Sequence, residues 1–219
     1  MANPLTLFPE SCVMLSPAYY GSVDYYATLA KYGKAVIDYS SRFDKRLKST
    51  HRTVIADVNR ELNLTFPIEK PISMTAARWG DIRVSRHGEW WHVHRVSIES
   101  AYGRTPYFEF YADKFADFFH AGTPEKYPLL ADLNIAINTT ICNILGIDTE
   151  IKFSAENIQD AEDCRGKNLP VYEPVPYYQV RQDNFGFIPH LSILDLIFNM
   201  GPESPLVLQK MIYQQKTDI

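Results

Sequence analysis

The sequence predicts an α/β fold in which a mixed sheet combines Rossmann-like parallel N-terminal strands, an antiparallel hairpin and packed helices. The chain opens with the order strand, helix, strand, which most readily folds as a right-handed parallel unit. Two runs with period-two alternation follow between residues 53 and 68, and segments with helical spacing fill much of the remainder. With 219 residues, one domain over residues 1–219 is the expected organisation.

The opening unit begins with a short apolar strand at residues 12–15. After the break at Ser16 and Pro17, apolar residues recur at spacings of three and four over residues 23–32, which indicates a helix. Gly33 stands where the C-cap of that helix is expected. A second apolar run at residues 35–39 completes the parallel pair.

The central part of the chain predicts a hairpin followed by helices. Strands are expected at residues 53–58 and 62–68, extending the parallel sheet, with a further short strand at residues 81–85. Apolar stripes then indicate helices, the longest of them closed by Gly146. These helices are expected from Trp90 to about Gly103, over residues 108–119, and over residues 127–145.

The C-terminal part is less regular. A short strand at residues 151–153 and an acidic surface loop at residues 154–169 are expected, followed by an edge strand at residues 177–180. The apolar stripe over residues 191–200 predicts a helix, with His190 or Ser192 as its N-cap. A last helix is expected over residues 205–214.

Composition limits the classes of function. Apolar residues make up 46% of the chain and charged residues 22%, as in ordinary globular proteins, and the net charge is -4. This charge disfavours nucleic acid and anionic lipid as partners. No stretch has the 18 to 20 apolar residues of a membrane span, and no secretory leader is recognisable, so we expect a cytoplasmic protein without membrane insertion. Three cysteines without a CxxC pair argue against disulfides and a cysteine zinc site.

Three histidines, His87, His92 and His94, stand close together and raise the question of a metal site. Helical spacing places only His87 and His94 on one face, and no HExxH pattern is present. We therefore expect ordinary polar and capping histidines and no metal, and the sequence assigns no cofactor.

One basic segment, residues 42–52, stands out in this acidic chain. Its position after a strand places it near the end of the sheet where ligands collect, and arginine can hold a phosphate or carboxylate with two hydrogen bonds. A solvated surface is the alternative interpretation. Because Arg52 adjoins a predicted buried strand, we expect it to point into a cleft, with Arg42 and Lys45 in solvent.

The helix at residues 191–200 carries a polar stripe formed by Ser192, Asp195 and Asn199, which share one face. The stripe can be a functional group or a capping and buried network that fixes the helix. A carboxylate in an apolar helix needs partners, since a stranded buried charge costs several kcal/mol. We therefore expect Asp195 to be buried and hydrogen-bonded to a backbone turn, a tyrosine or an arginine of the N-terminal half, so that this helix closes the pocket formed after the first strand.

Several motifs resemble those of the WbqC-like family of bacterial proteins. The most specific is the C-terminal segment GFIPHLSILDLIFNMGPES, and the opening LSPAYYGSVDYYATLAKYGKAVIDY, the hairpin RTVIADVNRELNLTFPIEKP and the central EWWHVHRVSIESAYGRTPYFEFY are also similar to the family. The resemblance implies a role in the biosynthesis of O-antigen type surface polysaccharides. Many relatives carry a Gly-Gly loop before the final motif, whereas residues 148–176 are short and acidic here and contain only Gly166.

The resemblance keeps two functions open. The first is an enzyme, a transferase that acts on a sugar-nucleotide or amino-sugar precursor. In this hypothesis His94 and Asp195 handle protons, and a phosphorylated or sugar ligand is held by the binding residues Tyr19, Arg52, Tyr178, Gln179 and Ser192. The second is a non-catalytic binding or assembly protein of the same pathway, with pathway proteins as partners, because the Gly-Gly segment is missing.

Overall fold

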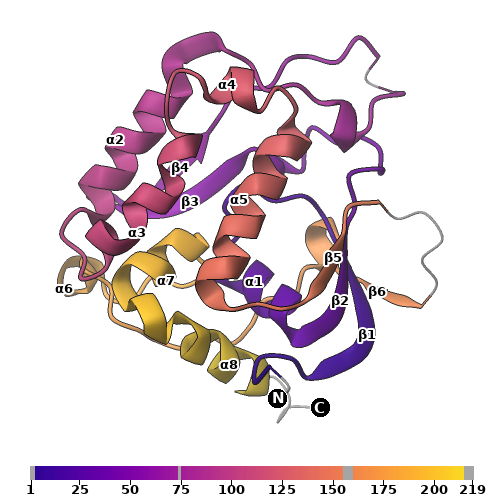
Figure 1. Cartoon of the computed structure of the whole chain (residues 1–219). Helices are drawn as coiled ribbons and strands as arrows, with labels where there is room; N and C mark the ends of the chain where they lie inside the picture. The colour runs from indigo at the N-terminus through magenta and orange to yellow at the C-terminus, as the bar shows by residue number, and fades with distance from the viewer. Residues whose placement is uncertain (1–2, 74, 155–159, 215–219) are drawn as a thin grey trace.

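A parallel four-stranded sheet combines two N-terminal strands with two short strands from the second half of the chain (Figure 1). The computed structural model describes residues 3–73, 75–154 and 160–214. The sheet has the order β5-β2-β1-β6, and every neighbouring pair is parallel. Its strands are β1 (Phe8–Leu15), β2 (Tyr32–Ile37), β5 (Glu150–Lys152) and β6 (Ala161–Asp163). The predicted parallel pairing of the first two strands is confirmed.

Helix α1 (Val23–Lys31) connects β1 to β2 and is buried along nearly its whole length. Its N-cap is Ser22, whose hydroxyl accepts a hydrogen bond from the Tyr25 backbone N–H at 3.3 Å. The prediction of a Gly33 C-cap is wrong, because the helix ends at Tyr32 in an extended conformation and Gly33 belongs to β2. A Cβ at Gly33 would lie 2.0 Å from the Pro9 carbonyl oxygen, so the close approach of β1 requires glycine there.

The hairpin forms a two-stranded sheet of its own instead of extending the parallel sheet. Strands β3 (Arg52–Asp57) and β4 (Arg60–Thr65) pair antiparallel, with residues 58–59 as the turn. The side that bears Ile55 and Leu64 is buried, and β3 contacts the helices α2 and α7. The apolar face of the hairpin is therefore covered by helices, which explains why it leaves the main sheet.

The strand expected at residues 81–85 does not form. Residues 79–81 make a 3-10 turn, and the following residues make only isolated bridges, Val84 with Ile68 and Arg83 with Leu129. These two partners come from different segments, so no continuous ladder develops.

The predicted helices of the central part are present with shifted ends. They are α2 (Trp90–Tyr102), α3 (Phe108–Phe115) and α5 (Leu130–Leu145), and a single helical turn that was not predicted, α4 (Thr123–Lys126), lies between the last two. Helix α5 begins three residues later than predicted, because Tyr127 precedes a proline, which disfavours helical backbone. It ends as predicted at Gly146, whose φ of 65° is the left-handed conformation of a helix C-cap.

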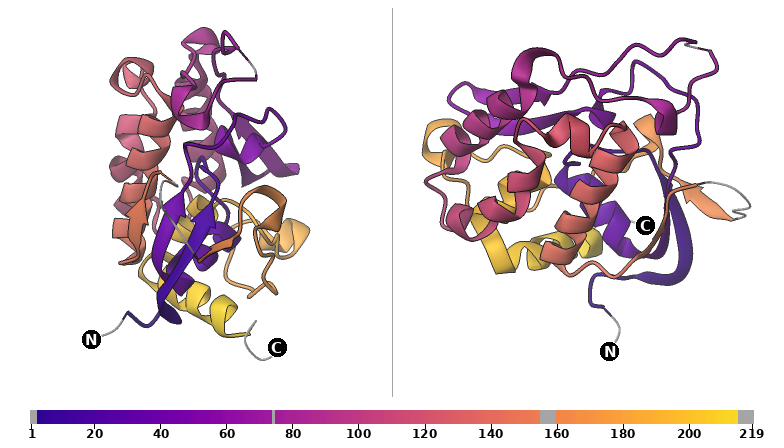
Figure 2. Two further views of the ribbon diagram at one scale, coloured as in Figure 1. Left: turned by 90° about the vertical axis from the view of Figure 1, so that its right-hand side faces the viewer. Right: turned by 45° about the horizontal axis from the view of Figure 1, so that its top comes forward.

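The last third of the chain departs most from the sequence prediction. Strand β6 lies inside the segment expected to be a loop, of which residues 155–159 are outside the described part. The edge strand expected at residues 177–180 is irregular backbone instead. Three helices follow, α6 (Gln182–Phe185), α7 (Ile193–Met200) and α8 (Ser204–Gln214). The left view of Figure 2 shows α5 and the segment after β6 on opposite sides of the sheet.

Candidate functional site

A cavity of about 220 Å³ lies at the carboxyl ends of β1 and β6. Ser16 directly follows β1 and Cys164 directly follows β6, and both border the cavity. In the sheet, β2 lies on one side of β1 and β6 lies on the other. The chain continues from β1 to β2 and returns only later to β6, so the order of the strands reverses between β1 and β6. Crevices at such a switch point are where ligands bind in open parallel sheets.

The amino ends of α1 and α7 meet beside the cavity and are tied to each other. The Val23 N–H donates to the Leu191 carbonyl at 3.0 Å, and the Ile193 N–H donates to the Gly21 carbonyl at 2.9 Å. The two N-caps, Ser22 and Ser192, form the antiparallel bridge between these segments and border the cavity. The positive ends of two helix dipoles therefore converge on one wall.

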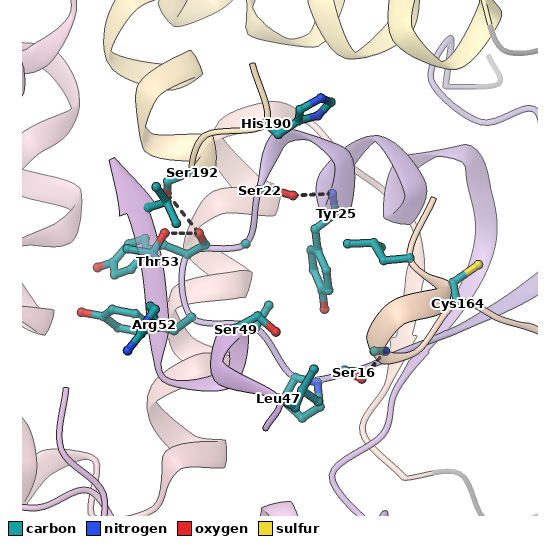
Figure 3. A pocket seen from close by; sticks show the side chains of 18 residues that line it. Ser16, Ser22, Tyr25, Leu47, Ser49, Arg52, Thr53, Cys164, His190 and Ser192 are labelled. Atoms are coloured by element: carbon teal, nitrogen blue, oxygen red, sulfur yellow. Dashed lines mark hydrogen bonds between the residues drawn. The ribbon is translucent and has the colours of Figure 1, made fainter. Parts of the chain in front are cut away.

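Arg52 brings a positive charge to the cavity wall from β3, next to Thr53 and Ser192 (Figure 3). Its Nε donates to the Thr65 hydroxyl at 2.8 Å, which fixes the side chain. Neither terminal nitrogen has a hydrogen bond or ion pair within residues 3–73, 75–154 and 160–214. The described residues that border the cavity include no Asp or Glu, so Arg52 has no counter-charge in the wall. Arg52 is also the one Lys or Arg side chain among the described residues that border the cavity.

As the sequence predicted, Arg52 is half-buried in a cavity, and Arg42 and Lys45 are exposed. The difference arises because Arg52 begins a buried strand, whereas the other two lie in the connection between β2 and β3.

Tyr25 extends along the cavity from α1, with its hydroxyl toward the side on which Ser16 and Ser49 lie (Figure 3). Burial raises the pKa of this hydroxyl well above its ordinary value, so it stays protonated and can donate. The hydroxyl makes no hydrogen bond to any described residue. By contrast, Ser16, Thr53 and Ser192 use their hydroxyls to hold the walls: Ser16 accepts from the Gly166 N–H at 3.0 Å, and the other two donate to the Tyr20 carbonyl.

Tyr19 borders the cavity, but its hydroxyl points into the core and lies 2.8 Å from Nδ1 of His94. His94 is 2% exposed and also has a hydrogen bond to the Thr65 backbone. Desolvation lowers the pKa of His94 to about 4, so the ring is neutral at physiological pH. His94 is not one of the residues that border the cavity, and its hydrogen bond to Tyr19 connects it to the cavity wall.

Asp195 is buried as predicted, with hydrogen bonds on both carboxylate oxygens. Oδ2 accepts from the Tyr177 hydroxyl at 2.7 Å and from Gln179 Nε2 at 2.8 Å, and the Tyr102 hydroxyl of the N-terminal half is a further partner. Burial raises the pKa of Asp195 to about 6 despite these bonds. This network lies behind the cavity wall, and only Ser192 of the predicted polar stripe borders the cavity.

The structure thus brings together three of the predicted site residues, Tyr19, Arg52 and Ser192. His94, Asp195 and Gln179 lie in buried networks next to the cavity, and Tyr178 is 47% exposed on the surface away from it. The sequence analysis did not single out Tyr25 as a site residue, although its place in the first turn of a helix after a switch-point strand was a usable signal. In the described part of the chain, no group of three His, Cys, Asp or Glu side chains is arranged to hold a metal ion.

None of the helices in the described residues combines the length and the apolar character that a bilayer span requires. The fold and the cavity together define an α/β protein with a cavity at the switch point of a parallel sheet. The sequence profile of the WbqC-like protein family matches residues 16–167, and the chain belongs to this family. The C-terminal motif lies outside the matched range. Searches of curated proteins and of solved structures gave no match.

Proposed function

We propose that this protein binds a phosphorylated sugar precursor, such as a sugar nucleotide or an activated amino sugar, in the cavity between β1, β6 and the amino ends of α1 and α7. In this proposal it is a cytoplasmic transferase of surface polysaccharide biosynthesis. The observation that carries the proposal is the Arg52 guanidinium, whose terminal nitrogens are free among the described residues and have no acidic neighbour in the cavity wall.

The chemistry of the wall supports an anionic ligand with hydroxyl groups. Arginine matches phosphate oxygens with paired hydrogen bonds, and helix amino ends favour negative charge. Tyr25 supplies a donor in the cavity wall for a sugar oxygen. The volume of about 220 Å³ is below the range of drug-sized sites, roughly 300–1,000 Å³, so the enclosed part of the ligand is small and the nucleotide of a sugar nucleotide extends through the open side.

The decisive experiment measures binding by titration calorimetry with UDP-N-acetylglucosamine and inorganic pyrophosphate. Arg52→Gln removes a charged donor, and a hydrogen bond to a charged group contributes about 1.5–3 kcal/mol, so affinity falls by roughly 10- to 100-fold. Arg42→Gln is the matched control, because this arginine is exposed and outside the cavity, and its affinity stays within about twofold of wild type. Absence of binding to both compounds, or equal effects of the two variants, would overturn the proposal.

One observation supports the alternative function, a non-catalytic binding or assembly protein of the same pathway. The part of the sheet that follows α5 consists of two three-residue strands, β5 and β6, in the described residues. A ligand at a hundred times its Kd raises the stability by about 2.7 kcal/mol in either case. Turnover separates the two functions: a bound compound that is not converted in the presence of sugar and amino-acid acceptors favours a binding protein.

A further inference from the structure

A histidine at the rim of the same cavity contacts a buried carboxylate behind it, and the proposed function makes no use of this pair. His190 borders the cavity (Figure 3). Its Nδ1 is 3.0 Å from Oδ2 and 3.1 Å from Oδ1 of Asp24. Asp24 belongs to the first turn of α1 and is 4% exposed. Its Oδ1 also accepts the Tyr172 backbone N–H at 3.0 Å. The carboxylate is therefore held in place from two directions.

This arrangement fixes which nitrogen of His190 carries the proton. An ionised carboxylate can only accept hydrogen bonds, so a neutral His190 carries its proton on Nδ1 and presents a lone pair on Nε2. Nε2 has no hydrogen-bond partner among the described residues, and the side chain is 36% exposed. A base whose other nitrogen is oriented by a carboxylate is the arrangement that enzymes use to accept protons.

The backbone shows that this placement is specifically held. His190 has a φ of 60°, in the left-handed region that residues other than glycine rarely occupy. Tyr20, on another wall of the cavity, has a φ of 44°. Such conformations cost free energy and gather at functional sites, where the surrounding structure enforces them. Here the bond from the Val23 N–H to the Leu191 carbonyl anchors the residue next to His190.

We propose that His190 is the proton acceptor of this cavity and that Asp24 is its positioning residue. This inference rests on the proposed function, because it needs a ligand with a hydroxyl or amine group in the cavity. The O–H or N–H bond of the ligand breaks and its proton forms a bond to Nε2. The electron pair stays on the ligand oxygen or nitrogen, which becomes a nucleophile. The resulting imidazolium is stabilised by the Asp24 carboxylate 3.0 Å away.

The test reads the tautomer of His190 by long-range ¹H–¹⁵N NMR at the alkaline end of a pH series, where the ¹⁵N shifts of the ring no longer change with pH. The full chain is used, and the resonances are assigned from the spectrum of His190→Asn, since asparagine also tolerates left-handed backbone. The Nδ1–H form is expected to predominate in wild type and to give way to the Nε2–H form in Asp24→Asn. Exposed His87 serves as the internal control, with the same spectrum in both proteins. A predominant Nε2–H form in wild type would overturn the inference.

A titration with UDP-N-acetylglucosamine distinguishes this inference from the proposed function. The expected result is a shift of the His190 Nε2 resonance at the ligand concentration at which calorimetry shows binding, with no shift at His87. Binding without a shift at Nε2 overturns the role of His190 and leaves the proposed function intact. Absence of binding overturns the proposed function and, with it, the ligand that His190 would deprotonate, whatever the tautomer.

Discussion

Replacement of Asp195 by alanine gives the most informative test of how α7 is held in place. The carboxylate is 1% exposed and accepts two short hydrogen bonds, from the Tyr177 hydroxyl and Gln179 Nε2. Asp195→Ala leaves both donors buried without this acceptor. Each such donor costs about 1–3 kcal/mol, so the truncation costs roughly 2–6 kcal/mol before any gain is counted.

The alanine variant also gains stability, because it no longer has to bury a charged carboxylate, and this gain depends on pH. Burial raises the pKa of Asp195 in the folded state to about 6, against an ordinary value of 3.8, so at pH 7 the ionised carboxylate is less stable in the folded than in the unfolded protein by about 3 kcal/mol. Because the folded pKa is raised, this group stabilises the fold below pH 3.8, and that contribution is lost as the pH rises through 6. The alanine variant lacks it. Subtracting this gain from the loss of roughly 2–6 kcal/mol leaves a difference in free energy of unfolding between wild type and variant of no more than about 3 kcal/mol at pH 7, and the difference should grow as the pH falls toward 4.

Urea unfolding followed by tryptophan fluorescence at about pH 7 and pH 5 measures both values. Asp113→Ala is a suitable control, because this side chain is exposed and its loss should change stability by less than about 0.5 kcal/mol at either pH. Since α7 begins at Ser192 in the cavity wall, we expect ligand affinity to fall together with stability. An unchanged stability at both pH values would refute the reasoning, and a loss of affinity alone would indicate a direct chemical role for Asp195.

Two further predictions concern the core. Desolvation lowers the pKa of His94 to about 4, so the unfolded state takes up a proton first, and this group reduces stability as the pH falls from 6.5 to 4, by about 3 kcal/mol at most. The measurement is the difference in free energy of unfolding between wild type and His94→Gln in urea at several pH values. Taking this difference removes the contributions of His51, which acts in the same direction, and of Asp195, which acts in the opposite direction. A difference that does not change with pH would contradict the assignment. Gly33→Ala forces a Cβ against the Pro9 carbonyl and should lower the stability measured by thermal unfolding by about 1–3 kcal/mol. Gly88→Ala is the comparison, because a Cβ there has nothing within 4 Å and only the positive φ is unfavourable. Equal losses of stability in the two variants would show that the close approach at Gly33 is unimportant.

The sequence predicted those elements whose apolar pattern is complete in itself. Helices α1, α2, α5 and α7 each bury a stripe at helical spacing, and the hairpin alternates with period two. Strand β6 could not be found in this way, because its three residues, Ala161–Asp163, are two acids and one alanine at the edge of the sheet. Its pairing with residues 12–14 of β1 depends on a partner about 150 residues away. Local pattern carries no information on such a contact.

The same distinction between local pattern and distant contacts separates the site residues that the sequence predicted from those that it did not. Arg52 was predicted because a cation beside a buried strand is visible locally, and Asp195 was predicted to be buried because an acid interrupts an apolar helix. The pair of Asp24 and His190 was missed, since 166 positions separate the two residues and each has an ordinary local explanation, a helix first turn and an N-cap. Charged residues show their role in the sequence when the neighbours along the chain are unusual, and not when the partner comes from another segment.

The cavity depends on segments inside the range of the family match and on segments outside it. Residues 16–167 begin directly after β1 and contain α1, the hairpin and β6, and so supply Tyr25 and Arg52 to the cavity wall and Asp24 as the partner of His190. His190 and Ser192 come from the segment after this range. The reciprocal hydrogen bonds of Val23 and Ile193 show why the two parts are inseparable: each satisfies the first N–H of one helix with a carbonyl from the loop before the other. Because neither helix start is complete without its counterpart, the position of His190 relative to Asp24 is fixed by the same contacts that close the wall of the cavity.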